Sequence, residues 1–163
     1  SGYNSRYEEM LEVAEVIGLK SVNLIAGLNG VPKNLRPKLR ARLSHVLCEC
    51  YRVKRATKAI VMQDWSALGS LMNQSHASLK DDYEVSCREL DLLVELATVE
   101  RGVYGARMTG GGFGGCVIVL VETDQLEGVA DCISGQYDDR MGWAPGCYRV
   151  QAGAGAREIC AAL

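Results

Sequence analysis

Long apolar runs are missing from this sequence of 163 residues, since none reaches the roughly 18 to 20 residues that a bilayer-spanning helix needs. A secretory leader is missing too, so the seven cysteines predict reduced thiols and a cytoplasmic location rather than a disulfide framework. Cys48 and Cys50 are closely spaced, but no second pair at ligand spacing accompanies them. On a helix the two side chains would point to opposite sides, so we expect no metal site.

A strong charge imbalance is also lacking. The 18 lysines and arginines are set against 20 aspartates and glutamates, which gives a formal net charge of -2 and no electrostatic footprint for nucleic acid or an anionic membrane. Basic residues do crowd between Lys33 and Lys58, but apolar residues recur there at helical spacing, which favours a solvated helix face. With 48% hydrophobic and 23% charged residues, the composition predicts one globular domain over residues 1–163.

Glycine is concentrated at one place in the sequence. Five of the six residues from Gly110 to Gly115 are glycines, Phe113 being the exception, and an apolar stretch of strand character follows. Consecutive glycines expose backbone N–H groups and permit positive φ, whereas a hairpin turn needs only one or two of them. The run therefore predicts a loop that a ligand approaches closely, with a plain hairpin turn as the alternative.

Familiar nucleotide-binding patterns do not account for the run. Gly110, Gly112 and Gly115 satisfy the dinucleotide fingerprint, but that fingerprint needs a helix after the loop and here a strand is predicted. The glycine-rich loop of protein kinases does lie between two strands. However, no lysine follows Lys80, and the sequence contains neither His-Arg-Asp nor Asp-Phe-Gly. A Walker A loop is absent as well.

Hydrophobic spacing predicts helices first and a small sheet afterwards. Asp64 is the expected N-cap of one helix, and Ser86 with Glu89 and Asp124 with Glu127 are expected capping pairs of two others. The long second helix is expected to bury one face, which consists of Leu39, Leu43, Val46, Cys50, Val53, Thr57 and Ile60. Three further core candidates are Met62, Trp65 and Met72. The expected helices span residues 6–18, 36–62, 64–79, 86–102 and 124–141, and the expected strands residues 103–108, 116–121 and 147–152.

The glycine loop resembles the third motif of the GHMP sugar and metabolite kinases, and within that superfamily its flanks resemble the galactokinase family. Three segments carry the resemblance: residues 102–116 around the loop, residues 75–91 upstream of it, and residues 1–6 at the start. They lie in the family's order and spacing. Two departures are Tyr7, where the family usually has a second arginine, and Met10, where it has a cysteine.

The resemblance implies an α+β fold: a ferredoxin-like antiparallel sheet with added helices, lacking its first strand, which in the family precedes the position of Tyr3. It also implies that this chain is the C-terminal half of a longer kinase. The family's sugar motif, phosphate loop and catalytic aspartate belong to the N-terminal half and are absent here. We therefore expect no catalytic residue and no metal ligand in this chain, and no activity from it alone.

For the whole protein the resemblance implies transfer of the γ-phosphoryl group of ATP to the anomeric hydroxyl of galactose. The cofactors would be ATP and Mg²⁺, bound mainly by the missing half, and the partners galactose, ATP and that half. Two alternatives stay open: a kinase for N-acetylgalactosamine or arabinose, and a noncatalytic sugar sensor. The implied substrate-binding residues are Tyr3, Gly110, Gly111, Gly112, Phe113, Gly114 and Gly115.

His76 lies close to three acidic residues in the sequence, Asp81, Asp82 and Glu84, which raises the possibility of acid–base chemistry. No nucleophile stands at a suitable position relative to it. We therefore expect His76 to belong to a helix end with capping acids rather than to an active site.

Overall fold

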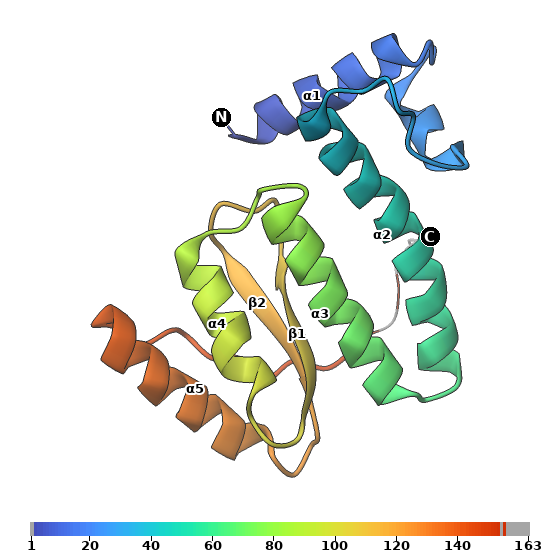
Figure 1. The fold of residues 1–163 in the computed structure, drawn as a ribbon. Coiled ribbons are helices and arrows are strands. Elements are labelled where there is room, and N and C mark those ends of the chain that lie inside the picture. Colours follow the sequence, from blue (N-terminus) through green and yellow to red (C-terminus); the bar gives the residue numbers. More distant parts are fainter. Residues whose placement is uncertain (1, 154, 156–163) are drawn as a thin grey trace, which may run out of the picture.

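A computed structural model describes residues 2–153 and 155 of the chain, in which a helical N-terminal part leads into a small sheet flanked by helices (Figure 1). The α+β fold class is confirmed. In chain order the elements are α1 (Gly2–Val16), η1 (Val22–Gly27, a 3-10 helix), α2 (Pro37–Val61), α3 (Trp65–Asp81), α4 (Arg88–Thr98), β1 (Val103–Thr109), β2 (Cys116–Val121) and α5 (Leu126–Met141).

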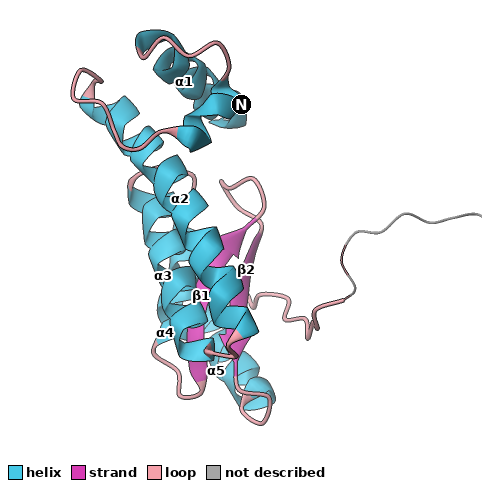
Figure 2. Cartoon of the chain, turned by 90° about the vertical axis from the view of Figure 1, so that its right-hand side faces the viewer, coloured by secondary structure: helices cyan, strands magenta, loops and turns pink. Residues whose placement is uncertain are grey.

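The sheet of the described residues consists of β1 and β2, which run antiparallel with Thr109 opposite Cys116. Helix α3 packs alongside β1 (Figure 2). Two of its side chains bind the backbone at the edge of β1 that does not pair with β2. The N–H of Ala106 donates to Asn73 Oδ1 at 2.8 Å, and the N–H of Met108 donates to His76 Nδ1 at 3.3 Å. These bonds cover an edge that would otherwise be open to pairing with another strand.

Three apolar clusters hold these elements together. One joins α1, η1 and the start of α2, and includes Val13 and Leu43, both fully buried. A second joins α4, α5 and the sheet around Tyr137. The third, around Leu90 and Met108, lies next to the start of the glycine loop, since Met108 is two residues before Gly110. Helices α2 and α3 form a hairpin that links the N-terminal helices to the sheet (Figure 1).

Most expected elements form within a few residues of their expected bounds. The N-cap at Asp64 is confirmed, because its Oδ1 accepts a bond from the N–H of Ala67 at 2.9 Å. The first helix begins earlier than expected, at Gly2 instead of Arg6. The fourth helix ends at Thr98, well before Gly102, which has a φ of 87° in the turn before β1.

The strand expected over residues 147–152 is wrong. This segment has no regular structure, and the described sheet holds only β1 and β2. An extended segment becomes a strand only when a neighbouring strand pairs with its N–H and C=O groups. Neither described strand pairs with it, so its alternating side chains, among them Tyr148 and Val150, remain exposed.

Both expected capping pairs are also wrong. The N-cap of α4 is Cys87, with no side-chain cap, and Ser86 instead donates to Asp91 Oδ1 at 2.6 Å. The N-cap of α5 is Gln125, again without a side-chain cap. A capping pair needs the serine hydroxyl to bind a backbone N–H group. In α4 that hydroxyl binds a carboxylate one turn into the helix instead.

The expected core face of α2 is correct only in its first half. Leu39 and Leu43 are buried, whereas Val53 and Ile60 are exposed, as is Met62 beyond the helix. Trp65, the other expected core residue at this turn, is 39% exposed. Periodicity shows which positions share a helix face but not how far along the helix another element covers that face. Among the described residues, none of the helices is both long enough and apolar enough to span a membrane.

Candidate functional site

The glycine run forms the tip of the hairpin between β1 and β2. Much of its backbone has positive φ, including Gly112 at 88° and the non-glycine Phe113 at 59°. Gly111 is different, because its φ lies outside the left-handed region and a Cβ added to it would meet nothing within 4 Å. The fold therefore gives no reason for glycine at position 111.

The loop rests on the segment between α3 and α4. A Cβ at Gly112 would lie 2.4 Å from the carbonyl oxygen of Val85, so only glycine permits this approach. The N–H of Phe113 donates to the same oxygen at 2.6 Å. The middle of the loop is thus fixed to Val85, while Gly110, Gly111 and Gly114 have open space where a Cβ would be.

The start of the chain lies against the same loop. A Cβ at Gly2 would be 2.7 Å from the ring of Phe113, so the ring packs on the backbone of the first turn of α1. Tyr3 follows directly in that turn. Its side chain lies outside the described part of the structure, so the sugar contact expected of Tyr3 stays a prediction, although its neighbour Gly2 lies against Phe113 of the loop.

A groove of about 560 Å³ lies between α1, η1 and the first half of the loop. Its walls combine apolar side chains with a few polar ones, as small-molecule sites do. The residues that give it polar and backbone groups are Arg6, Tyr7, Asn23, Tyr83, Gly110 and Gly111. A second hollow, of about 630 Å³, lies over α4 and is bordered by none of the predicted site residues.

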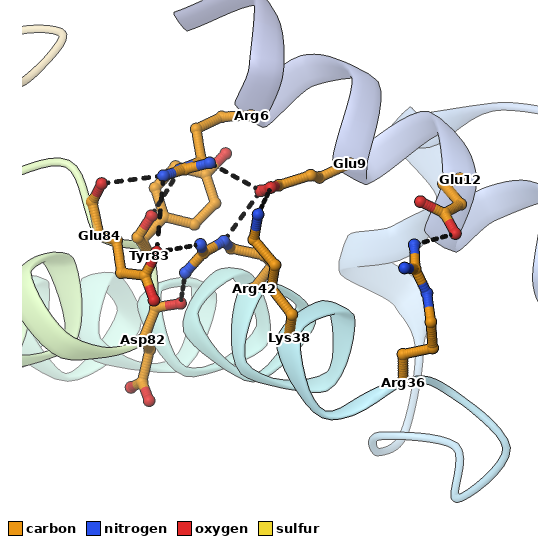
Figure 3. A network of polar contacts seen from close by, with 9 residues as sticks. All are labelled: Arg6, Glu9, Glu12, Arg36, Lys38, Arg42, Asp82, Tyr83 and Glu84. Carbon is orange, nitrogen blue, oxygen red and sulfur yellow. Dashed lines mark hydrogen bonds and ion pairs between the residues drawn. The ribbon is translucent and has the colours of Figure 1, made fainter. Parts of the chain in front are cut away.

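Next to the groove lies an ion-pair network that the sequence did not predict (Figure 3). Arg42 of α2 is fully buried and binds Glu9 Oε2 at 2.9 Å and Glu84 Oε2 at 2.5 Å. Arg6 of α1 binds the same Glu9 oxygen at 2.9 Å. Lys38 binds the other Glu9 oxygen at 2.7 Å. The basic stretch of α2 was expected to be a solvated face, and for Arg42 this was wrong.

The network shifts the acidities of its members. Burial alone would raise the pKa of Glu9, but hydrogen bonds from Lys38 and Arg42 lower it overall. The hydrogen bond from Arg42 lowers the pKa of Glu84. Burial works against the charge of Arg42, yet its bonds to Glu84 and Glu9 raise its pKa. Glu9, Glu84 and Arg42 are therefore charged at neutral pH, and their ion pairs support the groove wall.

The two histidines of the chain have structural positions. His76 is buried between β1 and α4, where Nδ1 accepts from Met108 and Nε2 lies 3.3 Å from Asp91 Oδ1. It is not part of acid–base machinery at the loop, and its acidic partner is Asp91 rather than the capping acids expected. His45 stacks on Tyr83 with ring centroids 4.5 Å apart. Burial lowers the pKa of His45 to about 4.

In the described ranges, 2–153 and 155, no group of three histidine, cysteine or acidic residues is placed to hold a metal ion. Cys48 is exposed and Cys50 is half-buried, and both are free, as are the other four described cysteines. The site thus consists of a backbone loop, a groove and a supporting network of charges. This arrangement is of a kind that suits the binding and orientation of a polar ligand.

Comparison with known proteins gives a consistent result. The family described as GHMP kinases C terminal matches residues 56–139. A galactokinase from Clostridium beijerinckii is 38% identical over 98% of this chain and 43% of its own length. A galactokinase from Canis lupus familiaris is 42% identical over 98% of this chain and 40% of its own length. One from Staphylococcus carnosus is 45% identical over 74% of this chain and 31% of its own.

Among solved structures, a Lactococcus lactis galactokinase complexed with galactose matches with a TM-score of 0.81 and 37% sequence identity. The match covers 88% of this chain and 39% of that protein. The chain therefore spans about two fifths of the length of such relatives.

Proposed function

The chain belongs to the GHMP kinase family, with the C-terminal domain of that family at residues 56–139, and from this we propose that it is the C-terminal part of a galactokinase. The whole protein would transfer the γ-phosphoryl group of ATP to the anomeric hydroxyl of galactose. In that reaction the hydroxyl oxygen bonds to the γ-phosphorus, the bond from that phosphorus to the bridging oxygen breaks, and ADP leaves. The observation that carries the proposal is the match over 88% of the chain to a galactokinase solved with galactose.

This chain would contribute binding and orientation. Phosphoryl transfer depends mostly on positioning and on stabilising charge, so a rigid wall beside the sugar has a direct effect on rate. We assign that wall to Gly110, Gly111, Gly112, Phe113, Gly114 and Gly115, and a sugar contact to Tyr3. Tyrosine suits the role because its ring packs on the C–H face of a sugar and its hydroxyl forms hydrogen bonds.

The glycine at position 111 supports this assignment. Its φ lies outside the left-handed region and open space lies where a Cβ would be, so a ligand can approach the backbone of Gly111 closely. The alternative, a simple hairpin turn, would place no ligand against this backbone.

Mg²⁺ and ATP fit this chain only in part. Its described residues offer no group of metal ligands, so Mg²⁺, which neutralises charge on the phosphates when bound, would be held by the N-terminal half. We propose that this half is the partner that completes the site, and that it supplies the phosphate loop and the group that aligns the sugar hydroxyl. The free cysteines fit a protein that works in a reducing compartment such as the cytoplasm.

The direct test is a kinase assay on the chain joined to its own upstream sequence. Galactose, N-acetylgalactosamine and arabinose are each supplied with ATP, and the products are identified by mass and by the position of the phosphate. We expect galactose 1-phosphate as the preferred product. Preferred phosphorylation of either other sugar would replace galactose as the substrate, and galactose binding without turnover would instead show a noncatalytic sensor.

A further inference from the structure

Four consecutive carbonyl groups between α3 and α4 each accept a hydrogen bond from outside their own segment, residues 82–85, which we call the connector. Figure 3 shows its first three residues with the arginines that bind them. Two arginines supply three of the bonds and the glycine loop supplies the fourth. The pairs are Arg42 with Asp82, Arg6 with Tyr83 at 2.7 Å, Arg6 with Glu84 at 3.0 Å, and the N–H of Phe113 with Val85 at 2.6 Å.

The connector needs this support because its backbone is strained. Glu84 has a φ of 52°, in the left-handed region that non-glycine residues rarely adopt. Such a conformation persists only where the surroundings determine it. Arg6 holds the carbonyl of Glu84 and Arg42 holds its carboxylate, so both arginines act on the strained residue.

Burial removes the water that would hydrate the Arg42 guanidinium. This loss is unfavourable unless the N–H groups of Arg42 find other hydrogen-bond partners. Its nitrogens reach Glu9 on α1, Asp82 at the end of α3, and Glu84 in the connector. It therefore ties together three elements that meet beside the groove. An apolar side chain could fill the same volume but could bind neither the carbonyl of Asp82 nor the carboxylate of Glu84.

The next residue of the connector holds the loop. Val85 accepts the bond from Phe113 and touches the Cα of Gly112 closely enough to exclude a Cβ. A shift of the connector therefore shifts Gly112 and Phe113 with it. We propose that Arg6 and Arg42 are positioning residues, which set the place of the glycine loop through the connector. The consequence for catalysis rests on the proposed function, whereas the structural coupling does not.

Amide hydrogen exchange on the chain tests the coupling without any activity. Arg6→Lys keeps the positive charge but loses the planar guanidinium that serves two carbonyls at once. We expect exchange at Phe113, whose N–H is bonded to Val85, to rise at least tenfold, while paired amides of β1 and β2 exchange as in the parent. Arg42→Lys should act in the same direction and provides a second variant.

Arg36→Lys is the matched control. Arg36 also joins the start of α2 to α1, through Glu12, but it is exposed and does not touch the connector. It should leave loop exchange unchanged. Loop exchange at the parent rate in Arg6→Lys would overturn the inference. So would an equal rise in the loop and in the strands, because that would show a general loss of stability.

Kinetics on the complete protein add the functional consequence. Arg6→Lys should lower kcat with galactose about tenfold while changing the KM for ATP less than twofold, since a misplaced wall affects orientation more than nucleotide binding. A parent protein that phosphorylates no sugar would defeat the proposed function but leave the exchange result standing. An active parent with an equally active Arg6→Lys variant would defeat the positioning role and leave the proposed function intact.

Discussion

Gly69 and Gly105 bring helix α3 and strand β1 into direct backbone contact. A Cβ at Gly105 would lie 2.1 Å from the carbonyl oxygen of Gly69, and a Cβ at Gly69 would lie 2.0 Å from the carbonyl oxygen of Tyr104. This approach lets Asn73 and His76, one and two turns further along α3, reach the N–H groups of β1. The helix thus sets the position of the strand that leads into the glycine loop.

Gly69→Ala should therefore destabilise the fold, by about 3 kcal/mol, because the added methyl group meets backbone atoms that cannot rotate away. Gly135→Ala is the matched control, since Gly135 also lies inside a helix but has open space at its Cβ position. It should stabilise by about 0.5 to 1 kcal/mol through reduced entropy of the unfolded chain. Urea unfolding measures the free energy of unfolding of both variants. Equal values for Gly69→Ala and Gly135→Ala would contradict the close contact.

Stability should fall as the pH drops from about 6.5 to about 4. In the unfolded chain His45 binds a proton near its ordinary pKa of 6.5, whereas burial in the fold lowers its pKa to about 4. Protons therefore favour the unfolded state throughout this window, and buried His76 shifts in the same direction. Carboxylates with lowered pKa, such as Glu9, lose their contribution only as the pH falls below about 4.5.

The variant His45→Gln separates the contribution of the histidine from that of the carboxylates. Glutamine can still donate to Ser78, the hydroxyl that lies 3.0 Å from His45 Nδ1, but it cannot titrate. The difference in unfolding free energy between about pH 6.5 and about pH 5 should be smaller in the variant than in the parent. An unchanged difference would show that His45 does not titrate in this window.

The chain alone should phosphorylate no sugar. It contains no phosphate loop, and its described residues hold no metal site. Incubation with ATP and galactose should leave both unchanged at the level of a blank. Turnover that stays with the chain through purification would contradict the proposal that the N-terminal half supplies the phosphate loop and the group that aligns the sugar hydroxyl.

Tyr3→Ala in the complete protein should weaken sugar use by about 1 to 3 kcal/mol, as loss of a hydrogen bond and of ring contact would. The KM for ATP should stay nearly the same. Steady-state kinetics in both substrates measure this, and Tyr51→Ala, on α2, 63% exposed and outside the groove lining, is the control. An equal effect of Tyr3→Ala on both substrates would make Tyr3 a structural residue.

The sequence predicted the parts of the fold that depend on local pattern. Hydrophobic spacing located the helices and the two strands, and the glycine run located the candidate site. The wrong predictions share a cause. The strand at residues 147–152, the exposed half of α2 and the contacts of Arg42 each depend on which other element is nearby, and a one-dimensional pattern does not contain that information.

Arg42 shows how a signal can be present and still be misread. It stands in a basic stretch most of whose other members are solvated, yet it is one residue before the core residue Leu43, at the edge of the apolar face. Its acidic partners, Glu9 and Glu84, are 33 and 42 residues away in the sequence. The packing of α1 against α2 brings Glu9 to Arg42, and the packing of α3 against α2 brings Glu84.

Gly111→Ala in the complete protein tests the central claim most directly, namely that the loop from Gly110 to Gly115 is the wall of a sugar site and not a turn. Position 111 has open space and no left-handed φ, so alanine should leave the melting temperature within about 1 °C of the parent. Turnover of galactose by the same preparation should fall at least tenfold, because a methyl group enters the space of the sugar and phosphates. Gly112→Val should lose both stability and turnover, the latter by about two orders of magnitude. A Gly111→Ala protein with parental melting temperature and parental turnover would contradict the account and make the loop a turn.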